Sequence, residues 1–272
     1  EWLQGEDLSQ RLRSGPLSPA DAMLLLRRIT EALDAAHCHQ IVHRDLKPSN
    51  LFLRGGEIDH VTLLDFGIAR RATNATAVTR TGLIIGTPEY MSPEQARGQR
   101  EIGPSADIFS LGCVFYECLT GQPPFVADAM AGVMAKILFE PAPPLRLRHP
   151  GVPESLDVLL SRMLEKDAAL RLQDAGQLLE ALGSLENSLG DLAALHITRV
   201  AAPKAPRTPA EQQLVSVLLS SVPSLMPDTD SDTNVAAPAD SDSARELQRA
   251  LSVFGAKVEI LADGSIVAML TQ

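Results

Sequence analysis

Four polar residues between positions 45 and 65 have side chains that can do chemistry together: Asp45, Lys47, Asn50 and Asp65. Two carboxylates and an amide can hold Mg²⁺, a hard cation that prefers oxygen ligands and also binds substrate phosphates. In the stretch "DLKPSN", Lys47 can neutralise a phosphoryl group while Asp45 accepts a hydroxyl proton. This combination indicates phosphoryl transfer, which depends mainly on positioning and charge stabilisation.

Short elements must position these residues. The segments "NLFLR" and "HVTLLDFG", separated by the turn at Gly55 and Gly56, predict two strands. Asp65 stands at the end of the apolar second strand, and the glycine two positions later permits backbone geometry that other residues resist. Upstream, "LSPADAMLLLRRITEALDAAH" predicts a helix that Ser18 caps and that has Pro19 in its first turn.

The second half of this region predicts a helical domain. "SADIFSLGCVFYECLT" is apolar nearly all round, which is typical of a helix buried inside a domain, and "GQPPF" ends it. Three further helices are expected near 127–139, 154–165 and 174–186, whereas residues 71–83 have little apolar pattern and predict a loop. Cys113 and Cys118 fall on the buried helix and are expected to be core residues.

The composition excludes several classes of protein. The chain has 272 residues and a net charge of −10, which argues against general attraction to nucleic acid. No apolar run reaches the roughly 18 residues of a membrane helix. The three cysteines have no framework spacing, so we expect a reducing, cytoplasmic compartment. The chain begins at "EWLQGEDL" without Met, so we expect a fragment.

The motifs now support a family resemblance. "HRDLKPSN" followed by "DFG" resembles the catalytic-loop and metal-loop signatures of protein kinases, and Asp65 stands 20 positions after Asp45. "GTPEYMSPEQ" is similar to a third family motif, with Ser92-Pro93-Glu94 where the family has Ala-Pro-Glu. "ADIFSLGCVFYECLTGQPPF" resembles the central buried helix of the family. The resemblance is to eukaryotic-like Ser/Thr protein kinases, in their bacterial form.

This resemblance implies a role for each site residue. Asp45 is expected to be the catalytic base, Lys47 the phosphate-contacting lysine, and Asn50 and Asp65 the ligands of Mg²⁺ that accompanies ATP. Arg44 implies control by phosphorylation of the activation segment, because its cation needs an anionic partner. The remaining implied residues are the candidate phosphosites Thr73, Thr76, Thr79 and Thr81, the substrate-positioning Thr87, the buried ion pair of Glu94 and Arg171, and Asp107, which ties the buried helix to the catalytic-loop backbone.

The resemblance covers only the larger lobe of a kinase. The smaller lobe should carry a Gly-rich loop, a strand lysine and a helix glutamate, and none occurs in this sequence. "EWL" is similar to the hinge between the lobes, so Glu1, Trp2 and Leu3 are expected there, with Glu1 and Leu3 beside the nucleotide. We therefore expect residues 1–186 to be a C-terminal lobe with little turnover by itself, in a parent protein with further domains.

The last third of the chain has a different character. The Pro-rich and basic stretch 187–209 predicts a linker, and 210–272 predicts an incomplete α/β segment with an acidic loop at 224–243. A strand is expected at "QLVSVLLSSV", a helix at "ARELQRALSVFG" and a hairpin at "AKVEILADGSIVAML". This tail resembles the start of a class III nucleotide cyclase-like domain. Asp263 matches one metal-binding Asp, but Ser220 or Ser221 stands at the other and supplies no carboxylate.

The predicted fold class is therefore α+β: a mainly helical kinase lobe with a small β part, then a linker and the incomplete tail. The predicted function is phosphate transfer from ATP to Ser/Thr hydroxyls of protein substrates. The alternatives are a pseudokinase-like scaffold that only binds partners and, more remotely, a nucleotide cyclase. His37-Cys38-His39 suggests a metal site only superficially, since the spacing suits a helix end, and His43 is expected to be structural.

Overall fold

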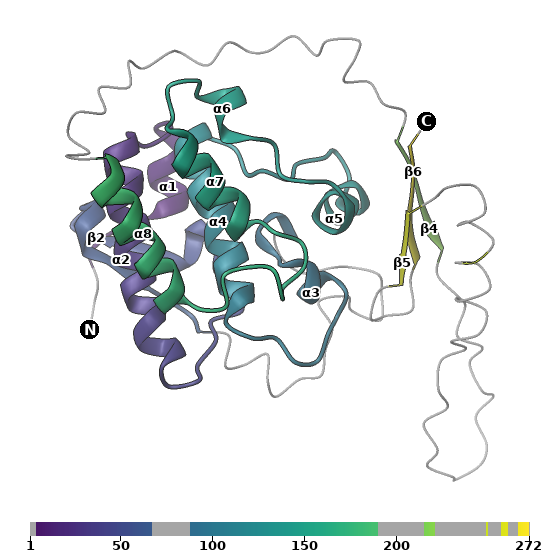
Figure 1. Cartoon of the computed structure of the whole chain (residues 1–272), viewed down its shortest axis with the longest axis horizontal. Coiled ribbons are helices and arrows are strands. Elements are labelled where there is room, and N and C mark those ends of the chain that lie inside the picture. Colours follow the sequence, from purple (N-terminus) through teal and green to yellow (C-terminus); the bar gives the residue numbers. More distant parts are fainter. Residues whose placement is uncertain are drawn as a thin grey trace.

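The computed structural model describes residues 4–66, 88–189, 215–220, 249, 257–260 and 266–271. The first two ranges form a helical lobe with a small sheet, and the later ones include the strands of a second sheet (Figure 1). Helix α2 (Pro19–His37) packs against α4 (Ser105–Thr120) and α8 (Ala175–Leu189), while α7 (Glu154–Met163) packs against α4 and α8. The predicted helical lobe with a small β part is confirmed.

Helix α2 forms where its caps and its apolar spacing predict it. The Ser18 hydroxyl accepts a hydrogen bond from the backbone N–H of Asp21 at 3.1 Å, and Pro19 occupies the first helical position. Its buried side recurs at helical spacing and includes Met23, Leu26, Ile29, Leu33 and His37. The helix therefore ends with a buried histidine directly before the catalytic loop.

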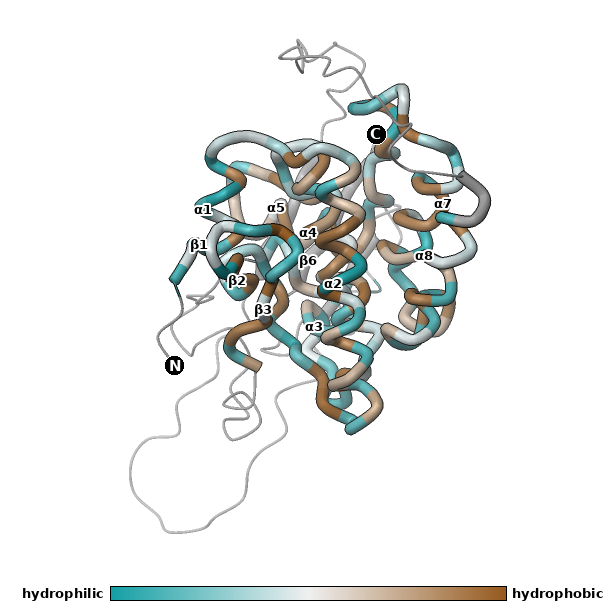
Figure 2. The backbone as a smooth tube through the Cα atoms, turned by 90° about the vertical axis from the view of Figure 1, so that its left-hand side faces the viewer, coloured by the Kyte–Doolittle hydropathy of each residue, from teal (hydrophilic) through white to brown (hydrophobic). Residues whose placement is uncertain are grey.

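Helix α4 is the centre of the lobe. All of its residues except Glu117 and Thr120 are buried, as its apolar sequence predicts. It ends at Gly121, which adopts a φ of 79°, a conformation that glycine takes without steric cost. A Cβ atom at Gly112 would lie 2.9 Å from Cδ2 of Leu164, so this glycine permits the close approach of the segment that ends α7. Figure 2 shows α4 as hydrophobic over most of its length, whereas α2 and α8 alternate.

The small sheet flanks the predicted site residues: β2 begins directly after Asn50, and β3 ends two positions before Asp65. Its order is β1 (Gly5–Asp7), β2 (Leu51–Arg54) and β3 (Val61–Leu63), with both pairs antiparallel. Strands β2 and β3 are the predicted hairpin, and Gly55 and Gly56 both take positive φ at its turn. Strand β1 was not predicted. It leads into α1 (Leu8–Arg13), whose first turn is closed by a capping box from Asp7 to Gln10.

Shorter elements complete the lobe. They are the helices α3 (Pro93–Ala96), α5 (Met130–Phe139) and α6 (Leu145–Arg148), and the 3₁₀ turns η1 (Pro48–Asn50), η2 (Ile58–His60) and η4 (Pro88–Tyr90). Helices α5, α7 and α8 confirm the three predicted helices. Helix α8 runs to Leu189, three residues beyond the predicted end at 186. None of the described helices is long and apolar enough to cross a membrane.

The tail contains three described strands. β4 (Val215–Ser220), β5 (Lys257–Ile260) and β6 (Ile266–Thr271) form a sheet of order β4-β6-β5, in which both pairs are antiparallel. The predicted strand and hairpin are confirmed. The last strand, β6, lies between β4 and β5, which therefore run parallel to each other. Of the predicted helix near 244–255, only Arg249 lies among the described residues, and it is helical. Apart from 187–189, the predicted linker and acidic loop lie outside them, as does Asp263.

Candidate active site

The catalytic-loop residues Asp45, Lys47 and Asn50 converge in space. Nζ of Lys47 lies 2.8 Å from Oδ2 of Asp45, and the amide nitrogen of Asn50 donates to the same carboxylate oxygen at 3.1 Å and to the Asp45 carbonyl at 2.7 Å. Asn50 is buried, whereas Asp45 and Lys47 are half-buried. The carboxylate is therefore fixed by two donors on one oxygen and stays accessible from outside.

Asn50 and Asp65 have donor atoms suited to a hard cation. Because the amide nitrogen of Asn50 is committed to Asp45, its amide oxygen must point away from that residue. The backbone N–H of Leu64 donates to the Asn50 carbonyl at 2.9 Å, which brings the start of the Asp65 segment to Asn50. Asp65 is exposed and has a φ of 52°. An amide oxygen and an exposed carboxylate on adjacent backbone segments fit Mg²⁺.

The backbone of the catalytic loop is held by Asp107 of α4. Its carboxylate is fully buried and accepts from the backbone N–H groups of His43 and Arg44, each at 2.8 Å. Nε2 of His37 lies 3.0 Å from Oδ2 of Asp107, and Nδ1 of His37 accepts from the backbone N–H of Ala175 at 3.2 Å. His37 therefore carries its proton on Nε2 and joins α2, α4 and α8 beneath the loop.

His43 is a structural residue of the loop, as its sequence context predicts. Its side chain is fully buried, and its ring contacts Phe66 with the centroids 4.7 Å apart. Nδ1 accepts from the backbone N–H of Asp45 at 3.3 Å, and Nε2 donates to the carbonyl of Leu64 at 2.9 Å. The imidazole thus joins the backbone of the catalytic loop to the backbone just before Asp65.

Arg44 is held by hydrogen bonds to its backbone and to its side chain. It has a positive φ of 66°, which costs a non-glycine residue roughly 1–3 kcal/mol, so the surroundings must hold it there. Its N–H is bound by Asp107, and its carbonyl accepts from Nε2 of Gln95 at 2.7 Å. Its guanidinium donates to the carbonyl of Ile102 at 3.3 Å. The main chain of the loop is therefore fixed from both α4 and α3.

The predicted buried ion pair between Glu94 and Arg171 forms. The guanidinium contacts the carboxylate in a bidentate way, with N–O distances of 2.8 and 3.1 Å. Arg171 also donates to the carbonyls of Ser105 and Glu165, at 2.7 and 2.9 Å, and is 3% exposed. The pair joins α3 to the segment before α8 and to the start of α4.

Burial shifts the pKa values of Glu117 and Lys166 in opposite directions. Burial raises the pKa of Glu117, and the neighbouring Glu89 raises it further, although the Tyr90 hydroxyl donates to Glu117 at 2.6 Å. Burial lowers the pKa of Lys166 to about 7. Nζ of Lys166 lies 3.6 Å from the ring centroid of Phe125 and donates to a carbonyl of α5.

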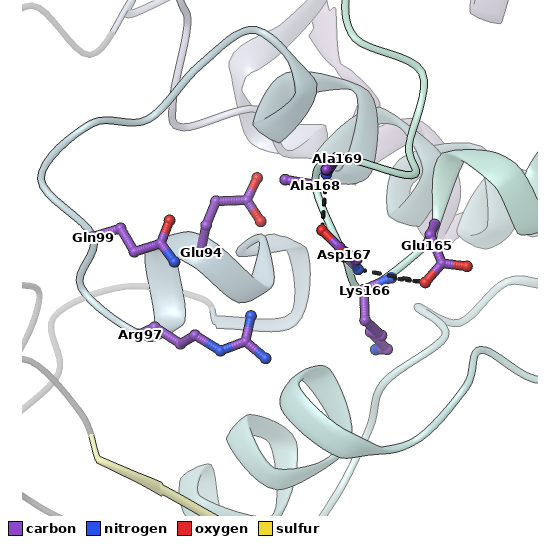
Figure 3. A pocket seen from close by; sticks show the side chains of 8 residues that line it. All are labelled: Glu94, Arg97, Gln99, Glu165, Lys166, Asp167, Ala168 and Ala169. Carbon is purple, nitrogen blue, oxygen red and sulfur yellow. Dashed lines mark hydrogen bonds between the residues drawn. The ribbon is translucent and has the colours of Figure 1, made fainter.

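Lys166 also lines a cavity of about 620 Å³ between α3 and the segment after α7 (Figure 3). Glu94, Arg97 and Gln99 lie on the α3 side, and Glu165 and Asp167 on the other. The cavity carries charges of both signs and is separate from the cluster of Asp45, which contributes no side chain to it.

The structure brings most predicted site residues into one connected region. Hydrogen bonds join Lys47 and Asn50 to Asp45, and the backbone of the adjacent Arg44 to Asp107. The pair of Glu94 and Arg171 supports the same region through α3. Glu1, Trp2, Leu3 and the threonines Thr73, Thr76, Thr79, Thr81 and Thr87 lie outside the described residues. Among the described residues, no group of three or more His, Cys, Asp or Glu side chains is placed to hold a metal. The ring nitrogens of His37 contact Asp107 and Ala175 instead.

Sequence reasoning missed the roles of His37 and Gln95. The sequence places His37 in the helix pattern and in the His37-Cys38-His39 run, but nothing local indicates that it meets Asp107, 70 positions away. Gln95 had a readable signal, because Ser92 and Gln95 form a capping box in "SPEQ". That motif predicts the start of α3, although it does not predict that the Gln95 amide also reaches the carbonyl of Arg44.

Comparisons with known proteins agree with this geometry. The family model described as "Protein kinase domain" matches residues 1–181. Serine/threonine-protein kinase PknD of Mycobacterium tuberculosis is 43% identical over 178 residues, which are 65% of this chain and 26% of the relative. Serine/threonine-protein kinase PknB of Mycolicibacterium smegmatis is 36% identical over 221 residues, 80% of this chain and 33% of the relative. The chain thus spans between a quarter and a third of these two relatives.

A solved structure shows the same fold. The crystal structure of Rad53 residues 1–466 in complex with AMP-PNP superimposes with a TM-score of 0.54 and 24% sequence identity. The match covers 67% of this chain and 44% of that one. It extends the likeness from the sequence motifs to the arrangement of the helical lobe.

Proposed function

The chain belongs to the protein kinase domain family, and from this premise we propose that the whole protein transfers the γ-phosphate of ATP to Ser or Thr hydroxyls of protein substrates. The observation that carries the proposal is the cluster in which Lys47 and Asn50 both contact the Asp45 carboxylate. A half-buried carboxylate with fixed orientation can accept a proton from a hydroxyl, and the adjacent ammonium can stabilise charge on a phosphoryl group.

The proposed chemistry assigns one task to each side chain. Asp45 accepts the proton of the substrate hydroxyl as that oxygen bonds to phosphorus and the bond to the ADP oxygen breaks. Lys47 contacts the oxygens of the transferring group. Asn50 and Asp65 would hold Mg²⁺, which supplies positive charge beside the phosphates. Arg44, Asp107 and Gln95 act on the loop backbone and not on the substrate.

Further parts of the proposal concern residues outside the described ranges. Glu1 and Leu3 would contact the nucleotide at the hinge, and Thr87 would position the protein substrate. A phosphorylated threonine among Thr73, Thr76, Thr79 and Thr81 would pair with Arg44, whose guanidinium donates, among the described residues, to the main-chain carbonyl of Ile102. We place the protein in the cytoplasm, with the kinase lobe at 1–186, the linker at 187–209 and the tail at 210–272.

The test is incorporation of labelled γ-phosphate from ATP by the whole protein into a protein substrate, followed by identification of the phosphoamino acids. Phosphoserine or phosphothreonine is expected, and Asp45→Asn should lower the rate of incorporation by about 10²- to 10⁴-fold. Asp128→Asn is the matched control, because Asp128 is exposed and lies in a different part of the lobe. Equal incorporation by Asp45→Asn and the unaltered protein would refute the proposal, as would Mg-ATP binding with no transfer, which would favour a scaffold.

A further inference from the structure

The tail sheet lies against the kinase lobe at one defined place. Strands β4 and β6 contact α5, and the sheet lies beside this helix (Figure 1). Nε of Arg97 donates to Oε1 of Glu259 in β5 at 3.2 Å, across 162 positions of sequence. The side chains of this ion pair are 28% and 30% exposed, so it lies at the rim of the contact.

The helix that the sheet approaches is strongly apolar. In α5, the residues Val133, Met134, Ala135, Ile137 and Leu138 are buried, and they occupy more than one side of the helix. A surface helix of a globular domain ordinarily leaves a polar face toward solvent. Helix α5 contacts α3 and η4 of its own lobe, and strands β4 and β6 of the tail sheet contact it as well, so the tail sheet contributes to the cover of this helix.

Arg97 connects this contact to the catalytic loop. It is the residue directly after α3, and its backbone N–H donates to the carbonyl of Pro93 at 2.9 Å. Gln95 of the same helix donates to the carbonyl of Arg44, next to Asp45. Glu94, directly before Gln95 in the helix, forms the ion pair with Arg171. One short helix therefore contacts the tail, the catalytic loop and the segment before α8.

From these contacts, we propose that the C-terminal sheet is a regulatory partner of the lobe in cis, docking on α5 and on Arg97 and biasing the catalytic loop through α3. The contact of β4 and β6 with the apolar helix α5 supplies the affinity, because a rim ion pair contributes little stability. The Arg97–Glu259 pair fixes the orientation of docking, since charges at a rim act mainly on specificity. The docking itself does not depend on phosphoryl transfer, whereas its effect on activity rests on the proposed function.

The first experiment tests whether residues 97 and 259 are neighbours in solution. In the Arg97→Lys variant of the full chain, a carbodiimide should couple the amine introduced at position 97 to the carboxylate of Glu259, and peptide mass spectrometry should identify the amide. Adding Glu259→Gln should remove that product. Arg146→Lys is the positive control, because Arg146 lies 3.7 Å from Glu154 within the lobe. Coupling in the control without any 97–259 product would overturn the proposal.

The second experiment tests whether docking reaches α3 and the loop. In the full chain, Arg97→Glu and Glu259→Arg should each accelerate hydrogen exchange of α5 and of residues 41–50, roughly threefold to tenfold, because each places like charges together at the rim. The double variant Arg97→Glu/Glu259→Arg restores opposite charges and should return exchange to the original rates. Faster exchange in the single variants with no recovery in the double variant would contradict docking through this pair.

These readouts separate the proposal from the kinase assignment. Neither coupling nor hydrogen exchange measures phosphate transfer, so failure of the phosphorylation assay leaves both results interpretable. If the pair couples and α5 responds but residues 41–50 do not, the sheet docks without biasing the catalytic loop, and the regulatory part of the proposal is wrong.

Discussion

The Asp107 carboxylate is the contact on which the geometry of the catalytic loop depends most. It is fully buried and accepts three hydrogen bonds, from the backbones of His43 and Arg44 and from the ring of His37. In Asp107→Asn, one acceptor oxygen becomes an NH₂ donor that faces another donor. The change removes at least one charge-assisted hydrogen bond, about 1.5–3 kcal/mol, and leaves a buried donor unpaired, about 1–3 kcal/mol more.

We therefore expect Asp107→Asn to lower the free energy of unfolding by about 3–5 kcal/mol. Urea unfolding of the full chain measures this as a shift of the midpoint with an unchanged slope. Hydrogen exchange of residues 41–50 should rise, because the backbone N–H of either His43 or Arg44 loses its acceptor when one of the two oxygens is replaced. Asp128→Asn, on the surface, should change stability by less than about 0.5 kcal/mol. A loss below about 1 kcal/mol, with catalytic-loop exchange unchanged, would refute this reasoning.

Three further predictions concern buried charges. Arg171→Met should destabilise the lobe by about 3–5 kcal/mol in urea unfolding, because it leaves Glu94 buried without its cation. Adding Glu94→Gln should recover part of this loss. Equal stability of Arg171→Met and the unaltered chain would contradict a structural role for the pair. Glu117→Gln should keep the Tyr90 contact and be more stable than the unaltered chain at neutral pH, because the raised pKa of Glu117 means that the fold favours its protonated, neutral form. This difference in the free energy of unfolding should shrink as the pH falls and Glu117 becomes protonated. A difference that grows on acidification would contradict the raised pKa. The pKa of Lys166 is lowered from 10.5 to about 7, so between these pH values the unfolded chain binds a proton that the folded chain does not. The free energy of unfolding of the unaltered chain should therefore rise by about 1 kcal/mol per pH unit relative to Lys166→Met between pH 7 and pH 9. Parallel pH profiles of the two proteins would exclude this shifted pKa.

Local signals in the sequence were enough to predict the main elements. Ser18, Pro19 and the apolar spacing define α2, and the nearly continuous apolar run defines α4 as buried. The glycine turn defines the β2–β3 hairpin. These features depend on residues close together in the sequence, so their physics can be evaluated from the sequence alone.

The contacts that fix the site depend on tertiary structure. Arg44 takes a positive φ, which propensity disfavours, because Asp107 and Gln95 hold its N–H and carbonyl. The His37–Asp107 bond and the Arg97–Glu259 pair join residues 70 and 162 positions apart. Strand β1 has three residues and exists through its pairing with β2. No local pattern carries such information.

The central claim is that Asp45 is the proton acceptor of a phosphotransfer site. The most direct measurement is the single-turnover rate of phosphate transfer by the whole protein, together with the Kd for Mg-ATP, in the unaltered protein and in Asp45→Asn. The account predicts a rate lower by about 10²- to 10⁴-fold in the variant, with Mg-ATP bound about as tightly, because Asp45 acts on the hydroxyl and not on the nucleotide. An unchanged rate would contradict the assignment of Asp45.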